Sequence, residues 1–540
     1  MLNVLKLVVK FFFIFLLPII FCVGCSGGGG DGGDVDVDTT PPPVPTGLTA
    51  TAVSASRIDV SWTASADAEG YKVYRNGTFY LDVFGARSIQ DIGVIANTTY
   101  NYRVSAFDSA GNESAQSALA SATTLDTATV LLGTAANDYA RGVALDSSGN
   151  VYVSGWTAGA LDGQPNPNGA DIFLTKYNVS GVRQWTRLLG TTGVTEPFST
   201  TAPNLADYGL NVAVDSTRSY VYVTGYTTAS MDGQAMNGSQ DLFLVRYDLN
   251  GNNKQTRLFA YYLAENAGNS VAVDLNGNVY VAAYSRGTTV AKDIILIKYD
   301  SSLTIQNFRV YDSNSGLDDV ATAVAVSADG NAVYVTGLTS GVLPQDIGNY
   351  SGGGDLFLAK FNAVPDLQWT TYLGSSELDA GLAICMDGTT VKVAGVTAGA
   401  LPGKTNAGGN DVIVASFDSN GALLWSQQFG TPADDSAFGI VVDSIGNPYV
   451  TGFTSGNLSP FKPNAGLEDQ FMARLSIGGA IFSYTMSGTS QGDEARGIAI
   501  RESDDLLYTV GFTGGNLDGE PYFGGIDASL LKFNLAGEQQ

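Results

Sequence analysis

The chain has 540 residues and contains no histidine. Histidine is the side chain that most often exchanges a proton near neutral pH, and it is the commonest metal ligand. Its absence excludes Ser-His-Asp and Cys-His catalytic arrangements and histidine metal sites. The sequence also lacks a P-loop, a G-x-S-x-G turn and an H-E-x-x-H motif. We therefore expect a protein that is not an enzyme.

The remaining catalytic alternative relies on carboxylates alone. A pair of carboxylates can cleave or eliminate sugars, but 52 Asp and Glu residues offer too many pairs to single one out. The S-x-D-x-G-x-T-W box typical of sialidases is also missing. A carbohydrate-active enzyme stays open as one alternative to a binding protein, and a structural envelope protein as another.

Basic residues and cysteines are both scarce. Only 27 Lys and Arg oppose the 52 acids, which gives a net charge of −25. Nucleic acid is a poor partner for such a surface, and no basic patch stands out. The three cysteines are Cys22, Cys25 and Cys385. We expect Cys385, within the strand-like run L-A-I-C-M-D, to be a buried structural thiol.

The N-terminus is typical of an export signal. Lys6 and Lys10 precede an apolar run over 11–23, which is too short for a membrane span, and then Gly24-Cys25-Ser26. This end resembles a bacterial lipobox, although Cys22 stands where leucine is usual. The resemblance implies a signal peptide over 1–24, a lipid on Cys25 and, from Ser26, an outer-membrane or cell-surface location. An ordinary signal peptide is the alternative. Residues 25–42 form a Gly-, Asp- and Pro-rich tether.

Residues 43–125 resemble a fibronectin type III module. The resemblance rests on P-P-P-V-P-T-G-L-T-A, on R-I-D-V-S-W ending at Trp62, and on T-T-Y-N-Y-R-V-S-A-F with Tyr100. It implies a β-sandwich with Trp62 in its core and Tyr100 as its tyrosine corner. No Arg-Gly-Asp tripeptide occurs, so we expect a spacer that holds the next domain away from the membrane.

Residues 126–540 repeat one phrase seven times. Its clearest copy, D-Y-A-R-G-V-A-L-D-S-S-G-N-V-Y-V-S-G-W-T, begins at Asp138. Asn266 opens the third copy, and aspartates open the other six: Asp138, Asp207, Asp319, Asp379, Asp435 and Asp493. Another aspartate opens the third strand-like run of every copy: Asp171, Asp241, Asp293, Asp355, Asp411, Asp469 and Asp527. Lys or Arg follows five residues later, except at Ser416. Four strand-like runs in a period of roughly 50–70 residues are typical of a β-propeller blade.

The two ends of the repeat region complement each other. The seventh copy has no fourth strand, whereas A-T-V-L-L-G-T over 128–134 matches the fourth strand W-T-R-L-L-G-T over 185–191. We predict that this N-terminal strand completes the last blade and closes the ring, which removes two open sheet edges.

The repeats resemble the SBBP family, a bacterial seven-bladed propeller repeat. Copies such as A-R-G-V-A-L-D-S-S-G-N-V-Y-V-S-G-W-T and G-G-D-L-F-L-A-K-F-N carry the resemblance. It implies an all-β, seven-bladed β-propeller over 126–540 with the G-V-A-L-D strand innermost, preceded by the fibronectin-like sandwich. It implies no defined activity.

The loops differ in length between the two faces of such a propeller. Tight turns such as D-S-S-G-N and N-V-S-G share one face, and the long loops between second and third strands share the other. Variable loops on a rigid scaffold usually carry binding. We expect a protein or glycan partner on the long-loop face, with these candidate contacts: Trp156, Asp162, Tyr226, Asp232, Asn237, Tyr350, Phe461 and Tyr522.

The six aspartates that open the copies allow two interpretations. If they circle the channel mouth, their oxygens suit Ca²⁺, the one cofactor we consider. Alternatively, each aspartate accepts backbone N–H bonds within its own blade and shapes its loop. Repetition in nearly every copy favours the second interpretation, because a single metal site rarely needs six copies.

Overall fold

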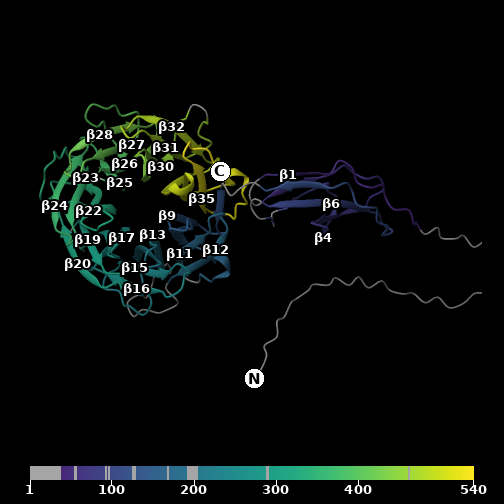
Figure 1. Ribbon diagram of the computed structural model, residues 1–540, viewed down its shortest axis with the longest axis horizontal. Coiled ribbons are helices and arrows are strands. Elements are labelled where there is room, and N and C mark those ends of the chain that lie inside the picture. Colours follow the sequence, from purple (N-terminus) through teal and green to yellow (C-terminus); the bar gives the residue numbers. More distant parts are fainter. Residues whose placement is uncertain are drawn as a thin grey trace, which may run out of the picture.

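The computed structural model describes residues 38–53, 57–91, 94, 98–124, 129–166, 169–190, 205–287, 291–388, 390–459 and 462–539. Cys25, the predicted signal and Phe461 lie outside these ranges. β-Strands joined by turns and loops form the described chain, and its only helical elements are the short 3-10 turns η1 (Leu161–Gly163), η2 (Glu502–Asp504) and η3 (Leu517–Gly519). Figure 1 shows two units, a sandwich beside a ring of sheets. No helix in these ranges has the length and hydropathy of a membrane span.

The first unit packs a three-stranded sheet on a four-stranded sheet. The first sheet contains β1 (Thr49–Ala52), β2 (Ile58–Ser61) and β5 (Ser88–Asp91), and the second contains β4 (Thr78–Phe84), β3 (Gly70–Arg75), β6 (Thr99–Phe107) and β7 (Ala120–Thr123). Trp62 and Tyr100 are both buried in the core between them, where Trp62 meets Tyr71 edge-on at 5.4 Å. This is the sandwich that the fibronectin-like resemblance implies.

Within the described residues, the second unit contains seven groups of four antiparallel strands, which we number as sheets one to seven. A short parallel pairing, Gly169 with Leu205 and Ala170 with Ala206, joins the first two groups into one eight-stranded sheet. Sheets one and two contain β9 (Asp138–Leu145), β10 (Val151–Thr157), β11 (Gly169–Tyr177) and β12 (Arg183–Leu189), then β13 (Leu205–Asp215), β14 (Tyr220–Thr227), β15 (Asp241–Asp248) and β16 (Gln255–Phe259). Sheets three and four contain β17 (Glu265–Val273), β18 (Val279–Arg286), β19 (Lys292–Tyr299) and β20 (Ile305–Tyr311), then β21 (Val320–Val326), β22 (Ala332–Thr339), β23 (Asp355–Asn362) and β24 (Leu367–Leu373).

The remaining sheets follow the same order until the last one. Sheets five and six contain β25 (Asp379–Asp387), β26 (Thr390–Thr397), β27 (Asp411–Phe417) and β28 (Leu423–Phe429), then β29 (Asp435–Val442), β30 (Pro448–Thr454), β31 (Asp469–Leu475) and β32 (Ile481–Ser487). Sheet seven contains β33 (Asp493–Arg501), β34 (Leu506–Thr513), β35 (Asp527–Asn534) and, as its fourth strand, β8 (Thr129–Leu132).

The strand β8 joins the start of the repeat region to its end. It pairs antiparallel with β35, so that Thr129 lies opposite Leu531 and Leu132 opposite Ala528. Beside this junction, the backbone N–H of Asp138 donates to the carbonyl of Ile526 at 2.6 Å. The first and last sheets are thereby connected through their backbones.

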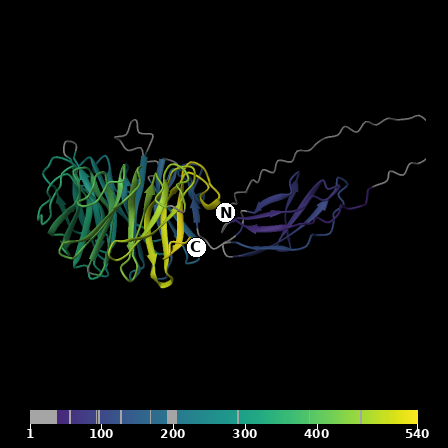
Figure 2. The same cartoon turned by 90° about the horizontal axis from the view of Figure 1, so that it is seen from above.

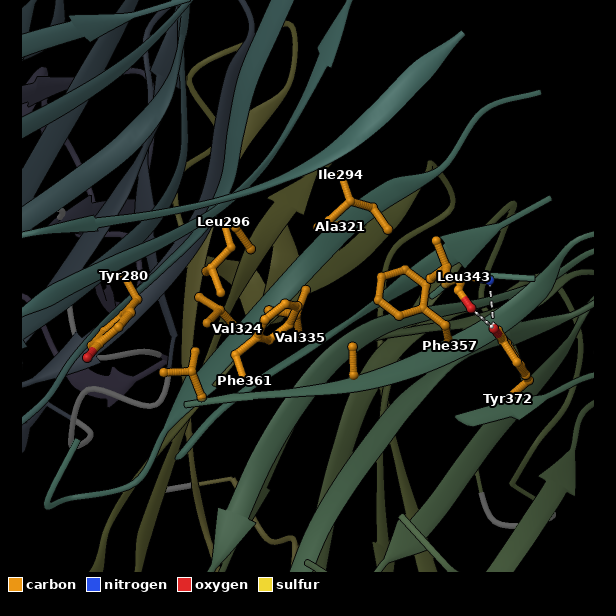
Figure 3. Close-up of a cluster of buried hydrophobic side chains, with 13 residues drawn as sticks. Tyr280, Ile294, Leu296, Ala321, Val324, Val335, Leu343, Phe357, Phe361 and Tyr372 are labelled. Carbon is orange, nitrogen blue, oxygen red and sulfur yellow. Dashed lines mark hydrogen bonds between the residues drawn. The ribbon is translucent and has the colours of Figure 1, made fainter. Parts of the chain in front are cut away.

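Apolar side chains fill the space between neighbouring sheets. Alternating residues on a strand point to opposite faces, so each V-Y-V run supplies apolar groups to both of its neighbours. Between sheets three and four, Tyr280 and Leu296 pack against Val335 and Phe361 (Figure 3). The N–H of Leu343 donates to the hydroxyl of Tyr372 at 2.8 Å and fixes a long loop over this core. The sheets therefore form a rigid frame for the loops.

Candidate ligand-binding site

The strands run between the two faces of the ring, which Figure 2 shows from the edge. Tight turns occupy one face. In the turn between β9 and β10, the N–H of Asp146 donates to the carbonyl of Asn150 at 3.0 Å, and the N–H of Gly149 donates to the carbonyl of Asp146 at 2.9 Å. The opposite face carries the loops that precede each first strand and those between second and third strands. Each first strand therefore begins at the long-loop face and ends at a tight turn.

A cavity of about 400 Å³ lies on the axis of the ring, and all seven first strands line it. In every sheet the pairing between first and second strands shifts register at one residue. Such a β-bulge bends the strand and re-aims a side chain. The seven bulge residues all line the cavity, and we refer to them as the axial ring: Arg141, Leu210, Asn269, Thr322, Leu382, Phe438 and Arg496.

Small residues flank the axial ring because the first strands crowd at the axis. A Cβ added to Gly142 would lie 2.9 Å from the backbone nitrogen of Val212 on the next sheet. Similar crowding at Gly439 would place a Cβ 3.1 Å from the backbone of Ile498. Glycine at these positions is what allows the sheets to approach closely enough to form a narrow axial cavity.

Two arginines are the only charged residues among the described residues that line this cavity. Burial lowers the pKa of Arg496 to about 10 and also lowers that of Arg141. Glu494 forms an ion pair with Arg496 and also interacts electrostatically with Arg141, while burial raises its own pKa. The Nε of each arginine is buried without a hydrogen-bond partner. The cavity wall thus carries positive charge that the protein neutralises only in part, and guanidinium groups whose hydrogen bonds are incomplete.

An arc of aromatic rings lies beside the axial ring towards the long-loop face, where Tyr139 precedes Arg141 on β9 and its ring centre lies 5.8 Å from the Arg141 guanidinium. Tyr139 stacks on Trp156 at 4.3 Å and meets Phe512 edge-on at 4.8 Å. Trp156 then contacts Tyr208 at 5.0 Å, and Tyr208 contacts Tyr226 at 4.9 Å. The rings come from sheets seven, one and two, and most of them are half-buried. They give the mouth a continuous apolar edge.

The guanidinium of Arg496 extends this aromatic arc into the sixth sheet. Its carbon lies 3.8 Å from the ring centre of Phe438, which stacks on Phe453 at 5.9 Å. The same guanidinium lies 6.0 Å from the ring centre of Phe512. The equivalent positions in sheets three, four and five hold small or aliphatic side chains, such as Ala267, Val320 and Ala380, except for Tyr284 opposite Ala267. The mouth is therefore chemically one-sided.

Trp156 and Tyr226, two of the predicted contacts, belong to the aromatic arc. The acidic candidates lie elsewhere: Asp162 forms an ion pair with Arg183 at 2.7 Å, and Asp232 one with Lys254 at 2.5 Å. Both partners flank the outermost strand of their sheet. These loops fold outward because an apolar residue before each aspartate, Leu161 or Met231, is buried.

The other loop candidates also lie away from the axial ring. The backbone N–H of Asn237 donates to Asp241 at 2.8 Å, which closes its loop. Tyr350 packs edge-on against Tyr372 at 5.9 Å, over the core of sheets three and four. The hydroxyl of Tyr522 donates to the carbonyl of Gly525 in its own loop. In these three cases the contacts shape the loop that carries the residue.

The six aspartates that open the copies are almost completely buried. Backbone N–H groups of the preceding loops donate to them: Thr134 to Asp138 at 2.7 Å, Ser313 to Asp319 at 2.8 Å, Ser375 to Asp379 at 2.6 Å, Thr431 to Asp435 at 2.5 Å and Thr489 to Asp493 at 2.6 Å. In the third copy Asn266 accepts the N–H of Tyr261 at 3.1 Å. An amide thus performs the same loop-shaping role, and the described residues contain no group of three metal-ligating side chains.

The single thiol of the described residues, Cys385, is half-buried on β25 and packs against the core between sheets five and six. Burial raises its pKa to about 12, so the group is a neutral thiol near pH 7.

Sequence reasoning missed the axial ring and most of the aromatic arc. A signal for the ring was present: three residues after the opening aspartate, a position flanked by small residues reads Arg, Leu, Asn, Thr, Leu, Phe and Arg in successive copies. The flanks repeat because the frame needs them, whereas the middle position varies. Variation at one position within a conserved frame is the pattern expected of a site.

Comparison with known proteins agrees with the repeat architecture. The SBBP family, described as a beta-propeller repeat, matches residues 129–161, 256–288 and 424–459. The chain is 27% identical over 421 residues to the "Regulatory protein FlaEY" of Caulobacter vibrioides, covering 68% of this chain and 42% of that protein. It is 44% identical over 104 residues to a poly(3-hydroxybutyrate) depolymerase of Ralstonia pickettii, covering 19% of this chain and 21% of the depolymerase. The chain thus spans less than half the length of these relatives.

Solved structures resemble parts of the fold. An Fn3-like protein from Clostridium thermocellum is 32% identical, with 15% of this chain and 92% of that chain covered and a TM-score of 0.15. The rhamnogalacturonan lyase YesX is 11% identical, with 90% of this chain and 89% of that chain covered and a TM-score of 0.32. The all-β fold with SBBP propeller repeats therefore stands on the chain's own strands and on the family match.

Proposed function

We propose that the chain is an exported, lipid-anchored envelope protein that binds a protein or glycan partner without catalysis. In this proposal the seven sheets are the blades of a closed propeller, and the fibronectin-like sandwich is a spacer between that propeller and a lipid on Cys25. The partner binds at the long-loop face, where the axial cavity opens beside the aromatic arc.

One observation carries the binding proposal. The repeats are alike wherever side chains build the sheets, yet the seven axial-ring residues, which share one cavity, differ in charge, size and polarity. A purely structural ring would favour the same side chain in every copy. Chemically distinct residues that converge from rigid strands on one concave surface are the arrangement expected of a binding site.

The test compares the aromatic arc with an aromatic residue elsewhere. Binding to a panel of envelope polysaccharides and envelope proteins would be measured with the chain from residue 25 onward. Tyr208→Ala should abolish binding of the partner, because it removes the middle of the arc. The control is Phe482→Ala on β32, whose side chain is exposed and distant from the axis. Equal binding by both variants and the unchanged protein would overturn the proposal.

A carbohydrate-active enzyme is the second candidate, and Glu494 is the observation that favours it. Its carboxyl group lies beside Arg141 and Arg496, and burial raises its pKa, as a proton donor requires. The chitinase, amylase, exoglucanase and depolymerases among the relatives match at most 25% of this chain, so their names describe those proteins. Release of new reducing ends over time, abolished by Glu494→Gln, would replace the binding proposal.

A further inference from the structure

The axial cavity combines two positive charges with flat apolar rings that lie beside it. Arg141 and Arg496 enter it from adjacent sheets, one and seven, which also supply Tyr139 and Phe512. We propose that this cavity binds the acidic end of a glycan, with a uronic-acid carboxylate held between the two arginines. The inference rests on the proposed binding function and names its ligand class.

The two arginines favour an anionic ligand, because the protein's own negative charge does not fully compensate the cost of burying their guanidinium groups. Taking a guanidinium out of water is unfavourable unless it is paired, and the lowered pKa of both arginines reflects that cost. Glu494 supplies one negative charge to two positive ones. The two buried Nε–H donors have no acceptor in the protein. A carboxylate ligand would supply the missing negative charge.

The aromatic arc favours a sugar over a peptide. Its rings stand in sequence from Phe512 to Tyr226 and offer stacking surfaces at the mouth, next to the arginines. The cavity, at about 400 Å³, is within the size range of small-ligand sites and is too narrow for a folded segment. Asn211 and Asn269 line the cavity from sheets two and three. Oδ1 of Asn211 accepts the N–H of Val271, and Nδ2 of Asn269 donates to the carbonyl of Ala321, so the other polar atom of each amide is the one that can meet a sugar hydroxyl.

The net charge of the chain affects which acidic ligands reach the cavity, short oligosaccharides or long polyanions. With a net charge of −25, the protein repels polyanions at most of its surface. A single acidic unit at the end of a chain reaches the arginines, whereas a long polyanion must also pass the acidic surface. We therefore expect short acidic oligosaccharides to bind at least as well as long ones, and binding to weaken with added salt.

Calorimetric titration of the chain from residue 25 onward tests the inference. The probes are trigalacturonate, its methyl ester, neutral galactotriose and a tri-glutamate peptide. We expect trigalacturonate to bind and the methyl ester and galactotriose to bind at least tenfold more weakly. Arg141→Gln and Arg496→Gln should each weaken trigalacturonate binding at least tenfold. The matched control is Arg183→Gln, which alters an arginine that pairs with Asp162 at the outermost strand of sheet one, away from the cavity.

The outcomes separate this inference from the proposed function. Equal binding of acidic and neutral sugars, unaffected by the arginine variants, overturns the acidic ligand but keeps glycan binding. Binding of tri-glutamate with no saccharide binding overturns the glycan class. If none of the four probes binds while a partner is still captured through Tyr208, the inference fails and the proposed function stands. Thermal unfolding of each variant, unchanged from the parent, shows that a lost signal reflects the site and not misfolding.

Discussion

Lys392 and Ser416 face each other across β26 and β27, where the other six sheets place a tyrosine opposite a lysine or arginine. Lys392 is 1% exposed and pairs with Asp387 at the end of β25. In the first sheet Lys176 instead reaches Asp146, the equivalent acid, at 3.9 Å. The fifth sheet has therefore moved its cation one strand inward, and this explains why Ser416 breaks the pattern.

The exchange predicts a compensating pair of substitutions. Lys392→Met should destabilise the protein by about 3 kcal/mol, because it removes the cation that pairs with Asp387 and leaves that carboxylate only the hydroxyl of Thr390. Lys392→Tyr combined with Ser416→Lys rebuilds the arrangement of the other sheets and should recover most of that loss. Urea unfolding measures both, with Ser416→Ala as the control. A double variant no more stable than Lys392→Met would contradict the interpretation.

Stability of the repeat region should rise as the pH falls from 7 towards 4. Burial, together with a neighbouring carboxylate in each case, raises the pKa of Asp171, Asp355 and Asp527 to about 6. Since these values lie above the ordinary one of 3.8, the protonated form favours folding. The contribution is complete below about pH 4 and is lost as the pH rises through 6. Calorimetric melting at several pH values measures it.

The variant Asp527→Asn isolates one of these carboxyls. It mimics the protonated group at every pH, so it should stabilise the protein at pH 7 by about 1–3 kcal/mol and flatten the pH dependence. A destabilised variant, or an unchanged pH profile, would show that the carboxylate form is the one the fold requires.

The sandwich should respond to acid in the opposite direction. Hydrogen bonds from Lys72, Ser105 and Tyr74 lower the pKa of Glu113 to about 2, below its ordinary value of 4.5. Its contribution is present above about pH 4.5 and is lost as the pH falls through 2. Fluorescence of Trp62, in a variant with the other tryptophans replaced by phenylalanine, reports this unit alone. A sandwich that melts higher at pH 3 than at pH 7 is incompatible with this assignment.

The opening aspartates should tolerate asparagine better than alanine. Asn266 already holds the N–H of Tyr261 in the third copy, so Asp379→Asn should retain the loop. Asp379→Ala leaves the N–H of Ser375 without an acceptor and should cost about 1–3 kcal/mol. Melting with and without calcium distinguishes the two interpretations. A calcium-dependent rise in melting temperature that Asp379→Asn removes would favour the metal site instead.

The lipid on Cys25 remains a prediction from sequence. Mass spectrometry of the protein purified from membranes should show a diacylglyceryl-modified cysteine as its first residue. Cys25→Ser should release the protein from the membrane fraction. An unmodified N-terminus at another residue would favour an ordinary signal peptide.

Sequence comparison of the chain with itself located the strands because sheet-forming residues recur for the same physical reasons in each copy. Gly374, for example, has equivalents after five of the seven fourth strands, since a Cβ there would lie 2.5 Å from Oδ1 of Asp355. The site was harder to find because it depends on differences between copies. The bulge that aims Arg141 into the cavity is a feature of backbone pairing, and alternation of apolar residues does not reveal it. The length of their loops led to the prediction that Asp162 and Asp232 bind a partner. The structure shows that each forms an ion pair near the outermost strand of its sheet instead.

The pairing of β8 with β35 has a consequence for how the protein is made. The seventh sheet combines a strand near the start of the repeat region with three strands from its end, and a contact such as Gln539 to Thr129 joins residues 410 positions apart. During synthesis β8 emerges long before its partners, so its hydrogen-bonding edge stays unmatched until the last repeat arrives. Final assembly therefore follows completion of the chain, and a truncated product would carry an exposed strand open to aggregation.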